Sequence, residues 1–357
     1  MPSTSTRRRT SSRSRPLSIA TGARAAELPI PGLAEAGYLT NETVFSLTEL
    51  PRRIAVIGAG PIGCELAQVF QRFGAQVTLL EVAPQILIRE DRDAAERVER
   101  ALIRDGVELV TGCKIIRVER RGSEKVIVAD SAGGRLEVVA DEILIGVGRV
   151  PAVEGLNLEA AMIEYDKQNG IKVDDYLRTT NPLVYAAGDV ASAYKFTHLS
   201  DAHARMILRN ALFLGRQRVS RLTIPWCTYT DPEIAHVGLY EADARQRGIE
   251  VDTYKQEMAE VDRAVLDGET VGFVKVHVRR GSDQIVGATI VASHAGEMIS
   301  ELTTAIAAGV GLGKLGDVIH PYPTQADSIR RAAGLYARTR LTPFVAGLMK
   351  RWFALTR

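Results

Sequence analysis

Three glycines and one glutamate form the clearest chemical motif in the chain. Gly58, Gly60 and Gly63 have the spacing GxGxxG directly after a short apolar run, and Glu81 ends the next apolar run. Between a strand and a helix, the first glycine permits a tight turn, the second lets the backbone approach a pyrophosphate, and the third lets helix and strand pack closely. The free N–H groups at the start of the helix then bind the phosphates. The motif predicts a dinucleotide site, and a glycine turn without a ligand is the alternative.

Glu81 bears on which dinucleotide would bind. Its carboxylate is placed to accept hydrogen bonds from the 2′- and 3′-hydroxyls of a ribose, and it would repel a 2′-phosphate. We therefore expect NAD(P)H, with NADH favoured over NADPH. Arg89 is close enough in sequence to weaken that preference.

The apolar patterning supplies the elements that would position this motif. Ile54–Ile57 and Gln76–Leu80 are short apolar runs typical of parallel strands buried on both faces. Cys64–Phe73 lies between them and indicates a helix. From residue 224 onward, period-two strands alternate with helices, which predicts a separate α+β domain.

Composition excludes several other classes of protein. The formal net charge of +2 over 357 residues does not favour binding to nucleic acid. Cys64, Cys113 and Cys227 are too far apart in sequence for a disulfide framework or a cysteine-rich zinc site, so we predict no metal site and a reducing cytoplasm. No apolar run approaches the roughly 20 residues that a bilayer-spanning helix needs.

The first sixteen residues differ from the rest of the chain. They are rich in serine, threonine and arginine and nearly free of apolar side chains, so we expect a disordered, solvated tail. A transit peptide or a nucleic-acid-binding arm would have a similar composition and is the alternative.

Six segments of the chain stand out as motifs, in the order Ile19–Gly22, Gly58–Glu65, Val147–Arg149, Tyr185–Asp189, Thr228–Ala235 and His320–Asp327. Their joint order resembles one family, the flavin-dependent pyridine nucleotide–disulfide oxidoreductases, and its mercuric-reductase-like branch in particular. The resemblance extends over about residues 19–337. It implies an oxidoreductase that passes electrons from NAD(P)H through FAD to a disulfide or a metal ion, and that works as a homodimer.

The resemblance also assigns residues to the cofactors. Asp189 would hydrogen-bond the ribityl chain of FAD, although an aspartate after a buried strand also suits a helix N-cap. Glu65 would face a lysine on the redox helix of the family. The full set of cofactor-binding candidates is Thr21, Gly22, Gly58, Gly60, Gly63, Glu65, Glu81, Gly148, Gly188 and Asp189.

The loop His320–Asp327 resembles the acid–base loop that the family donates across its dimer, which makes His320, Tyr322 and Asp327 the catalytic candidates. Tyr322 stands where dihydrolipoamide dehydrogenases have a histidine, and Asp327 where they have a glutamate. A tyrosine with a pKa near 10 is a poor base at neutral pH, but it can donate a hydrogen bond. The tyrosine therefore points toward mercuric-reductase-like proteins. His320 is a candidate proton donor, and because it is a lone histidine, a purely structural role is the alternative.

Two features of the family are absent from this sequence: the first flavin βαβ unit with its own GxGxxG, and the redox-active CxxxxC pair. Cys64 and Cys113 cannot replace that pair and are expected to be small buried residues. We therefore expect weak or absent FAD binding and no disulfide-dependent turnover. The alternatives are a catalytically inactive NADH-binding dimer, a gene fragment, or a flavin-free NAD dehydrogenase.

Together these patterns predict an α/β protein with a Rossmann-like nicotinamide domain, a partial FAD domain and a C-terminal α+β dimerisation domain. The final segment has apolar residues on one face and Lys350 and Arg351 among its polar positions. Packing on the dimer or the body of the protein is expected for it, and contact with an anionic membrane is the alternative. The predicted segments are 1–16 (tail), 17–50 (remnant of the FAD domain), 51–150 (NAD(P)-binding domain), 151–220 (second part of the FAD domain), 221–340 (dimerisation domain) and 341–357 (amphipathic helix).

Overall fold

The computed structural model describes residues 16–356, which divide into two compact units. Unit 1 combines the residues up to Arg24 with Arg149–Leu222, and unit 2 combines Ala25–Gly148 with the residues from Thr223 onward. The tail predicted for residues 1–16 lies outside the described residues, apart from Pro16.

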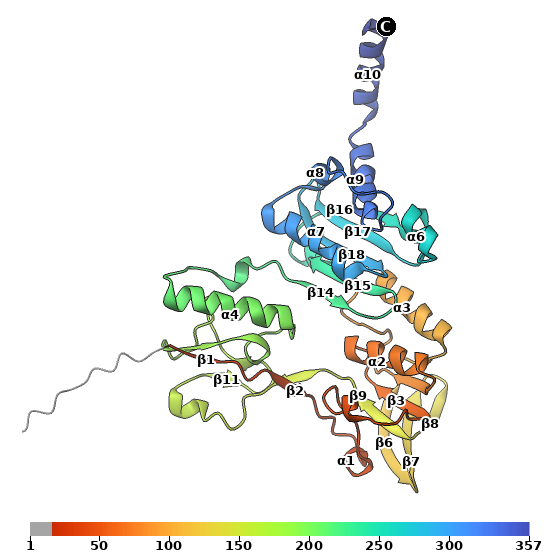
Figure 1. Cartoon of the computed structure of the whole chain (residues 1–357), viewed down its shortest axis with the longest axis vertical. Coiled ribbons are helices and arrows are strands. Elements are labelled where there is room, and N and C mark those ends of the chain that lie inside the picture. The colour runs from red at the N-terminus through yellow and green to blue at the C-terminus, as the bar shows by residue number, and fades with distance from the viewer. Residues whose placement is uncertain (1–15, 357) are drawn as a thin grey trace, which may run out of the picture. The chain divides into compact units, whose positions relative to one another are not determined.

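A four-stranded parallel sheet in the order β5-β4-β3-β9 carries the glycine motif in unit 2 (Figure 1). Alternate side chains of β3 enter two different cores: Ile54 and Val56 pack toward the helices, and Ala55 and Ile57 toward a second sheet. This explains why the strand is apolar at every position. The elements are β3 (Arg53–Ile57), β4 (Gln76–Leu80), β5 (Glu108–Val110), β9 (Glu142–Ile145), α2 (Pro61–Arg72) and α3 (Arg92–Asp105).

The second sheet of this region is antiparallel, with three strands in the order β6-β7-β8. Gly122 and Gly134 have φ angles of 67° and 105°, which L-residues rarely adopt, and they form the two turns between the strands. The strands are β6 (Lys114–Arg121), β7 (Glu124–Ser131) and β8 (Gly134–Ala140), and the short helices α1 (Leu33–Ala36) and η1 (Val44–Ser46) precede β3.

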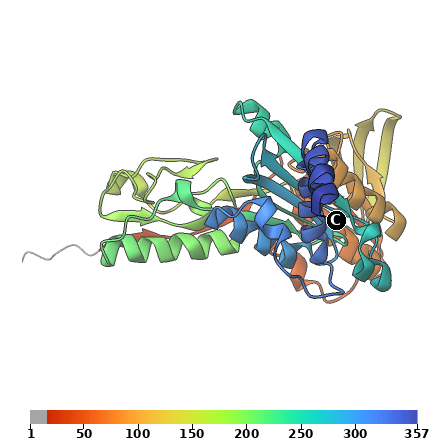
Figure 2. The ribbon, with the colours of Figure 1, turned by 90° about the horizontal axis from the view of Figure 1, so that it is seen from above.

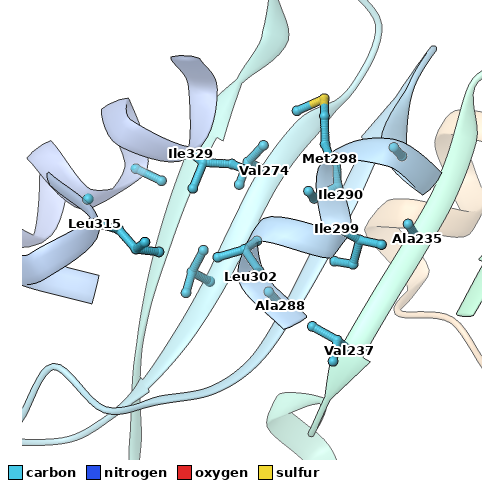
Figure 3. Packing of buried hydrophobic residues seen from close by; sticks show 14 of the residues in the cluster. Ala235, Val237, Val274, Ala288, Ile290, Met298, Ile299, Leu302, Leu315 and Ile329 are labelled. Atoms are coloured by element: carbon cyan, nitrogen blue, oxygen red, sulfur yellow. The ribbon is translucent and has the colours of Figure 1, made fainter. Parts of the chain in front are cut away.

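The C-terminal part of unit 2 is built on a five-stranded antiparallel sheet in the order β14-β15-β18-β17-β16. Its core lies between the sheet and the helices α7 and α9 (Figure 3). The strands are β14 (Pro225–Thr228), β15 (Glu233–Gly238), β16 (Val251–Glu257), β17 (Phe273–Arg279) and β18 (Ile285–Ala292). The helices are α5 (Glu241–Gln246), η5 (Met258–Glu260), α6 (Asp262–Asp267), α7 (Ala295–Ala308), α8 (Leu312–Gly316), α9 (Asp327–Thr339) and α10 (Pro343–Thr356).

Polar contacts join the two parts of unit 2. The buried Lys275 of β17 pairs with Asp91 at 2.6 Å and with Asp93 at 2.7 Å, both at the start of α3. Glu90 accepts hydrogen bonds from the hydroxyl of Tyr240 (2.6 Å) and from the indole of Trp226 (3.0 Å). The segment before α3 is therefore fixed to the five-stranded sheet.

Unit 1 is smaller and has little regular sheet. β1 (Leu17–Ile19) pairs in parallel with β13 (Val184–Ala186), and the long helix α4 (Thr197–Leu212) packs beside them (Figure 2). The strands β2 and β10 lie where the chain passes from one unit to the other. The remaining elements, these two strands included, are β2 (Ala23–Ala25), β10 (Arg149–Pro151), η2 (Leu158–Ala161), β11 (Tyr165–Asp166), β12 (Gly170–Ile171), η3 (Gly188–Val190) and η4 (Val219–Arg221).

The C-terminal helix α10 follows α9 (Figure 1), and none of its described side chains is buried. Among its large apolar residues, Phe344 is 81% exposed and Trp352 is 63% exposed, so residues 16–342 do not cover these side chains. The predicted packing of this helix on the body of the protein is wrong for the described residues, because α10 buries no side chain there, and packing on a dimer stays a prediction. Within residues 16–356 no helix has the length and apolar character needed to cross a membrane.

Candidate functional site

The glycine turn between β3 and α2 can be built only from glycine at two of its three positions. Gly58 has φ of 98°, and a Cβ there would lie 2.8 Å from a methyl of Val147. A Cβ on Gly63 would lie 1.8 Å from the carbonyl oxygen of Gly58. Gly63 therefore lets the first turn of α2 contact the end of β3, as its place in the motif predicts.

Gly60 is different because the protein itself does not require glycine there. Its backbone is extended (φ −73°, ψ −176°), and a Cβ added at this position would have the carbonyl oxygen of Gly146, at 3.8 Å, as its nearest neighbour. The space in front of Gly60 belongs to a cavity and is free for a ligand that contacts the backbone closely. Pro61 follows at the first position of α2, a 12-residue helix whose N-terminal amides face this turn.

Glu81 is held in place by two backbone amides. The N–H of Ala59 donates to Oε2 at 2.6 Å, and the N–H of Ala83 donates to Oε1 at 2.8 Å. Since a carboxylate has about four lone-pair positions, both oxygens can still accept a further hydrogen bond. The carboxylate is thus oriented before any ribose arrives, beside the glycine turn that would bind the phosphates.

A cavity of about 550 Å³ brings several of the predicted residues together in unit 2. Gly58, Gly60, Glu81 and Gly148 all line it, whereas Gly63 lies beneath the turn. The walls are otherwise mostly apolar, which suits the rings of a dinucleotide. The apolar lining side chains are Leu28, Ile30, Ile57, Pro61, Ile62, Leu80, Val82, Ile88, Ile115 and Val147.

The cavity also contains a cation that the sequence did not indicate. Lys114, the first residue of β6, lines the cavity, and Arg89 does not. Lys114 is far from Glu81 in sequence and reaches the cavity through the pairing of the second sheet, so only the fold could reveal it. Lys114 therefore supplies a positive charge on the wall of this cavity.

The cysteines near this cavity are buried, as predicted. Cys64 and Cys113 are 0% and 2% exposed, and burial raises the pKa of both thiols. Cys64 donates to the carbonyl of Ala59 at 3.3 Å. Neither thiol is poised for redox chemistry, because the reactive form is the thiolate.

Glu65 lies on α2 and does not line the cavity. Its Oε1 accepts a hydrogen bond of 2.8 Å from the backbone N–H of Tyr229, in the loop between β14 and β15. Burial raises the pKa of the Glu65 carboxyl, opposed by that hydrogen bond. The contact joins α2 to the five-stranded sheet.

The flavin-motif residues of unit 1 form their own group. Asp189, only 7% exposed, pairs with Nη1 of Arg149 at 2.6 Å, and its backbone carbonyl accepts from Lys195 at 2.5 Å. The helix N-cap interpretation of Asp189 is wrong, because its carboxylate caps no helix and forms the ion pair with Arg149 instead. Nε of Arg149 is buried without a hydrogen-bond partner in the described part of the chain.

The other unit 1 candidates are engaged in backbone structure. The N–H of Gly188 donates to Nδ1 of the buried His203 at 3.3 Å, and burial lowers the pKa of that histidine. The hydroxyl of Thr21 donates to the carbonyl of Ala152 at 2.7 Å, next to Gly22, whose φ is 73°. The sequence has a second GxGxxG spacing at Gly311–Gly316, but these residues form the short helix α8 and its N-cap in unit 2 and do not belong to unit 1.

Two residues of the predicted acid–base loop, His320 and Tyr322, have different surroundings. Nε2 of His320 lies 3.0 Å from Glu301, and its Nδ1 lies 3.1 Å from the carbonyl of Val318, so this histidine has structural partners. Tyr322 is 74% exposed, and its hydrogen bond to Asp262 raises the pKa of the phenol.

Asp327 is buried at the start of α9 beneath two arginines. Its two oxygens accept from Arg330 and Arg331, each at 2.7 Å, and these hydrogen bonds hold the pKa of the carboxyl below its usual value against the effect of burial. Arg331 also pairs with Asp262 at 3.3 Å, which links Asp327 to the carboxylate that contacts Tyr322. Asp262 and Arg331 were not predicted, since no local sequence signal distinguishes them from surface charges.

Across residues 16–356, no group of three or more His, Cys, Asp or Glu side chains is arranged to hold a metal ion. Most of the predicted site residues thus fall into three groups: the dinucleotide cavity, the Asp189–Arg149 pair and the Tyr322 loop.

Comparison with known proteins gives this geometry a family. The family model of the pyridine nucleotide-disulphide oxidoreductases matches residues 7–205, and that of their dimerisation domain matches residues 224–333. The second match supports the formation of a homodimer.

Three individual proteins illustrate the similarity. A mercuric reductase from Bacillus cereus is 37% identical over 314 residues, which cover 88% of this chain and 50% of that protein. A dihydrolipoyl dehydrogenase from Thermus scotoductus is 36% identical over 286 residues, which cover 80% of this chain and 62% of that protein. The solved Cu(II) complex of the HOCl-induced flavoprotein disulfide reductase RclA from Escherichia coli superposes with a TM-score of 0.83 at 29% identity, covering 90% of this chain and 72% of that chain.

This chain spans between half and two thirds of the length of the curated relatives it matches. Two family models in the expected order, relatives above 30% identity and a shared fold lead to one conclusion. The chain belongs to the pyridine nucleotide-disulphide oxidoreductase family.

Proposed function

We propose that the cavity beside Gly60 binds NADH as the electron donor of an FAD-dependent oxidoreductase. The observation that carries this proposal is the oriented carboxylate of Glu81, fixed by two N–H groups at the edge of a cavity whose turn leaves open space in front of Gly60. In this arrangement the start of α2 contacts the diphosphate, and Glu81 accepts from the ribose hydroxyls.

The preference for NADH follows from charge. A 2′-phosphate carries about two negative charges, and placing it against Glu81 costs electrostatic energy that a ribose diol does not. Lys114 lies on the same cavity and would offset part of that cost. We therefore expect a preference for NADH that increases when Lys114 is removed and decreases when Glu81 is neutralised.

The acceptor is proposed from the relatives and from the loop around Tyr322. FAD, when bound, would accept hydride from NADH and pass the two electrons on to the substrate. The exposed Tyr322 phenol donates its O–H to Asp262, which raises the pKa of the phenol, so its oxygen is left to accept a hydrogen bond at the acceptor site of the partner subunit. Asp327 and His320 position the loop. The substrate class is a metal ion or a disulfide, as the names of the relatives suggest.

A protein made of these 357 residues alone is proposed to bind FAD weakly. Asp189 and Arg149 would supply contacts for the ribityl chain, whereas unit 1 has no GxGxxG turn among its described residues to bind the ADP half. Without stable flavin, the same chain would be an NADH-binding dimer without turnover, which is the second candidate function.

One experiment distinguishes the oxidoreductase from the inactive NADH-binding dimer. NADH and NADPH are titrated against the purified protein by fluorescence, and reduction of a dye acceptor is then measured with and without added FAD. Saturable NADH binding with FAD-dependent dye reduction supports the oxidoreductase, and binding without reduction supports the inactive dimer. No saturable binding of either nucleotide would refute both.

A further inference from the structure

A second cavity, of about 530 Å³, lies in unit 1 beside the C-terminal end of α4. It shares no lining residue with the dinucleotide cavity of unit 2. Four of its eight lining residues are arginines, and two are tyrosines. The lining residues are Tyr176, Arg178, Tyr185, Asn210, Gly215, Arg216, Arg218 and Arg221.

The charge of this cavity is only half balanced. Arg178 pairs with Asp174 at 2.7 Å, and Nε of Arg218 lies 4.0 Å from Asp175. Arg216 and Arg221 form no ion pair with any residue in the described part of the chain. Since arginine stays protonated in proteins, the cavity wall carries an excess of two positive charges.

Tyr185 adds a hydroxyl without a protein partner. The residue is only 9% exposed, because its ring packs in the core between β13 and α4. Its hydroxyl makes no hydrogen bond to any of residues 16–356, and it is not sealed from solvent, so it opens into the cavity that Tyr185 lines. A nearly buried hydroxyl without a partner is expected to have one in a bound molecule or in water.

Other contacts hold the arginines in position. The guanidinium groups of Arg178 and Arg218 lie over the ring of Tyr176, at 5.1 and 5.4 Å from its centroid, and the hydroxyl of Tyr176 accepts from Arg218 at 3.0 Å. The side chain of Asn210 makes two hydrogen bonds, of 2.9 and 3.0 Å, with the backbone of Gln217. The loop that carries the arginines is therefore tied to α4 before any ligand binds.

We propose that this cavity is a binding site for a small phosphate-bearing anion. Arginine donors match phosphate oxygens in pairs, and two unpaired arginines with one free hydroxyl suit a ligand with two or more phosphate groups. Sites of this size enclose small molecules, and the arrangement is independent of the electron donor bound by unit 2.

The test is calorimetric titration of inorganic tripolyphosphate into the full chain, with and without saturating NAD⁺. Because the glycine turn of unit 2 also attracts phosphate, NAD⁺ separates the two sites. We expect one saturable site that NAD⁺ does not displace. The double variant Arg216→Gln/Arg221→Gln is expected to weaken this binding at least about tenfold through loss of charge-assisted hydrogen bonds, and Tyr185→Phe to weaken it less.

The matched control is Arg205→Gln/Arg245→Gln, which removes two arginines from surface ion pairs outside the cavity and leaves the same net charge. It is expected to bind tripolyphosphate like the wild type. Equal loss of affinity in both double variants would mean that net charge alone attracts the anion. Equal loss, complete displacement by NAD⁺, or no saturable binding in the wild type would each overturn the proposal.

Discussion

Replacing Gly60 by alanine separates ligand binding from folding at the dinucleotide turn. The backbone at Gly60 is one that alanine adopts without strain, and the new methyl would lie 3.8 Å from its nearest neighbour. We expect the free energy of unfolding to stay constant or to rise by about 0.4–1 kcal/mol, because alanine restricts the unfolded chain. The methyl would instead occupy the space that the diphosphate needs.

The loss of NADH affinity can be estimated from the contacts at risk. A hydrogen bond to a charged group contributes about 1.5–3 kcal/mol, so displacing the phosphate from one backbone N–H weakens binding by roughly one to two orders of magnitude. Fluorescence titration with NADH measures the affinity, and urea denaturation of the same preparation measures the stability.

Gly63→Ala is the matched contrast. Its Cβ would lie 1.8 Å from the carbonyl oxygen of Gly58, so α2 must move away from β3. Overpacking of this kind costs about 1–3 kcal/mol or more. If Gly60→Ala bound NADH as tightly as the wild type, the open space in front of Gly60 would not be the diphosphate site. If it lost as much stability as Gly63→Ala, the turn geometry would be wrong.

Three further results are expected. Asp327→Asn should lower the free energy of unfolding at pH 7 by about 1.5–3 kcal/mol, because two arginines lose a charged acceptor. The pKa of Asp327 is lowered in the folded state, so the difference in free energy of unfolding between variant and wild type should persist above about pH 4 and shrink as the pH falls further. Urea denaturation measures this difference, and a difference that does not change with pH would contradict the prediction. Burial lowers the pKa of His236 to about 3, so the wild type should lose about 2 kcal/mol between about pH 6.5 and 5, as the unfolded state takes up the proton. His236→Gln should flatten that slope in urea titrations, and an unchanged slope would assign it to other groups. A chain ending at Thr342 should keep the urea midpoint of the full chain, because α10 buries no side chain in this structure, and a lower midpoint would show that α10 packs on a partner subunit.

The parts that sequence could predict are those with local causes. The GxGxxG spacing, the apolar run of β3 and the acidic end of β4 all lie within about thirty residues, and each restricts backbone or burial by its own chemistry. The helix and strands of this βαβ unit accordingly occur within a few residues of their predicted limits. The burial of Cys64 and Cys113 follows from the same pattern.

The parts that could not be predicted depend on partners distant in sequence. Lys114 reaches the cavity only because β6 is placed there by its own sheet, and Asp189 meets Arg149 across forty residues. Asp327 was predicted as a catalytic residue from the family loop, and nothing in that loop indicates that two arginines of α9 would neutralise it. Charge pairing of this kind is a property of the folded surface.

The contacts of the segment 82–91 connect these observations. Val82 and Ile88 form part of the wall of the dinucleotide cavity, while Glu90 and Asp91 are bonded to the five-stranded sheet through Tyr240 and Lys275. The segment 82–91 thus contributes side chains to the cavity wall and, through its last two residues, hydrogen bonds and ion pairs to the five-stranded sheet and to Tyr240 just after β15. Because close-packed segments transmit displacement, we expect a change in the five-stranded sheet to alter the shape of the nucleotide cavity. The same contacts help to join residues 25–148 to the residues from Thr223 onward in one compact unit, even though residues 149–222 separate them in sequence.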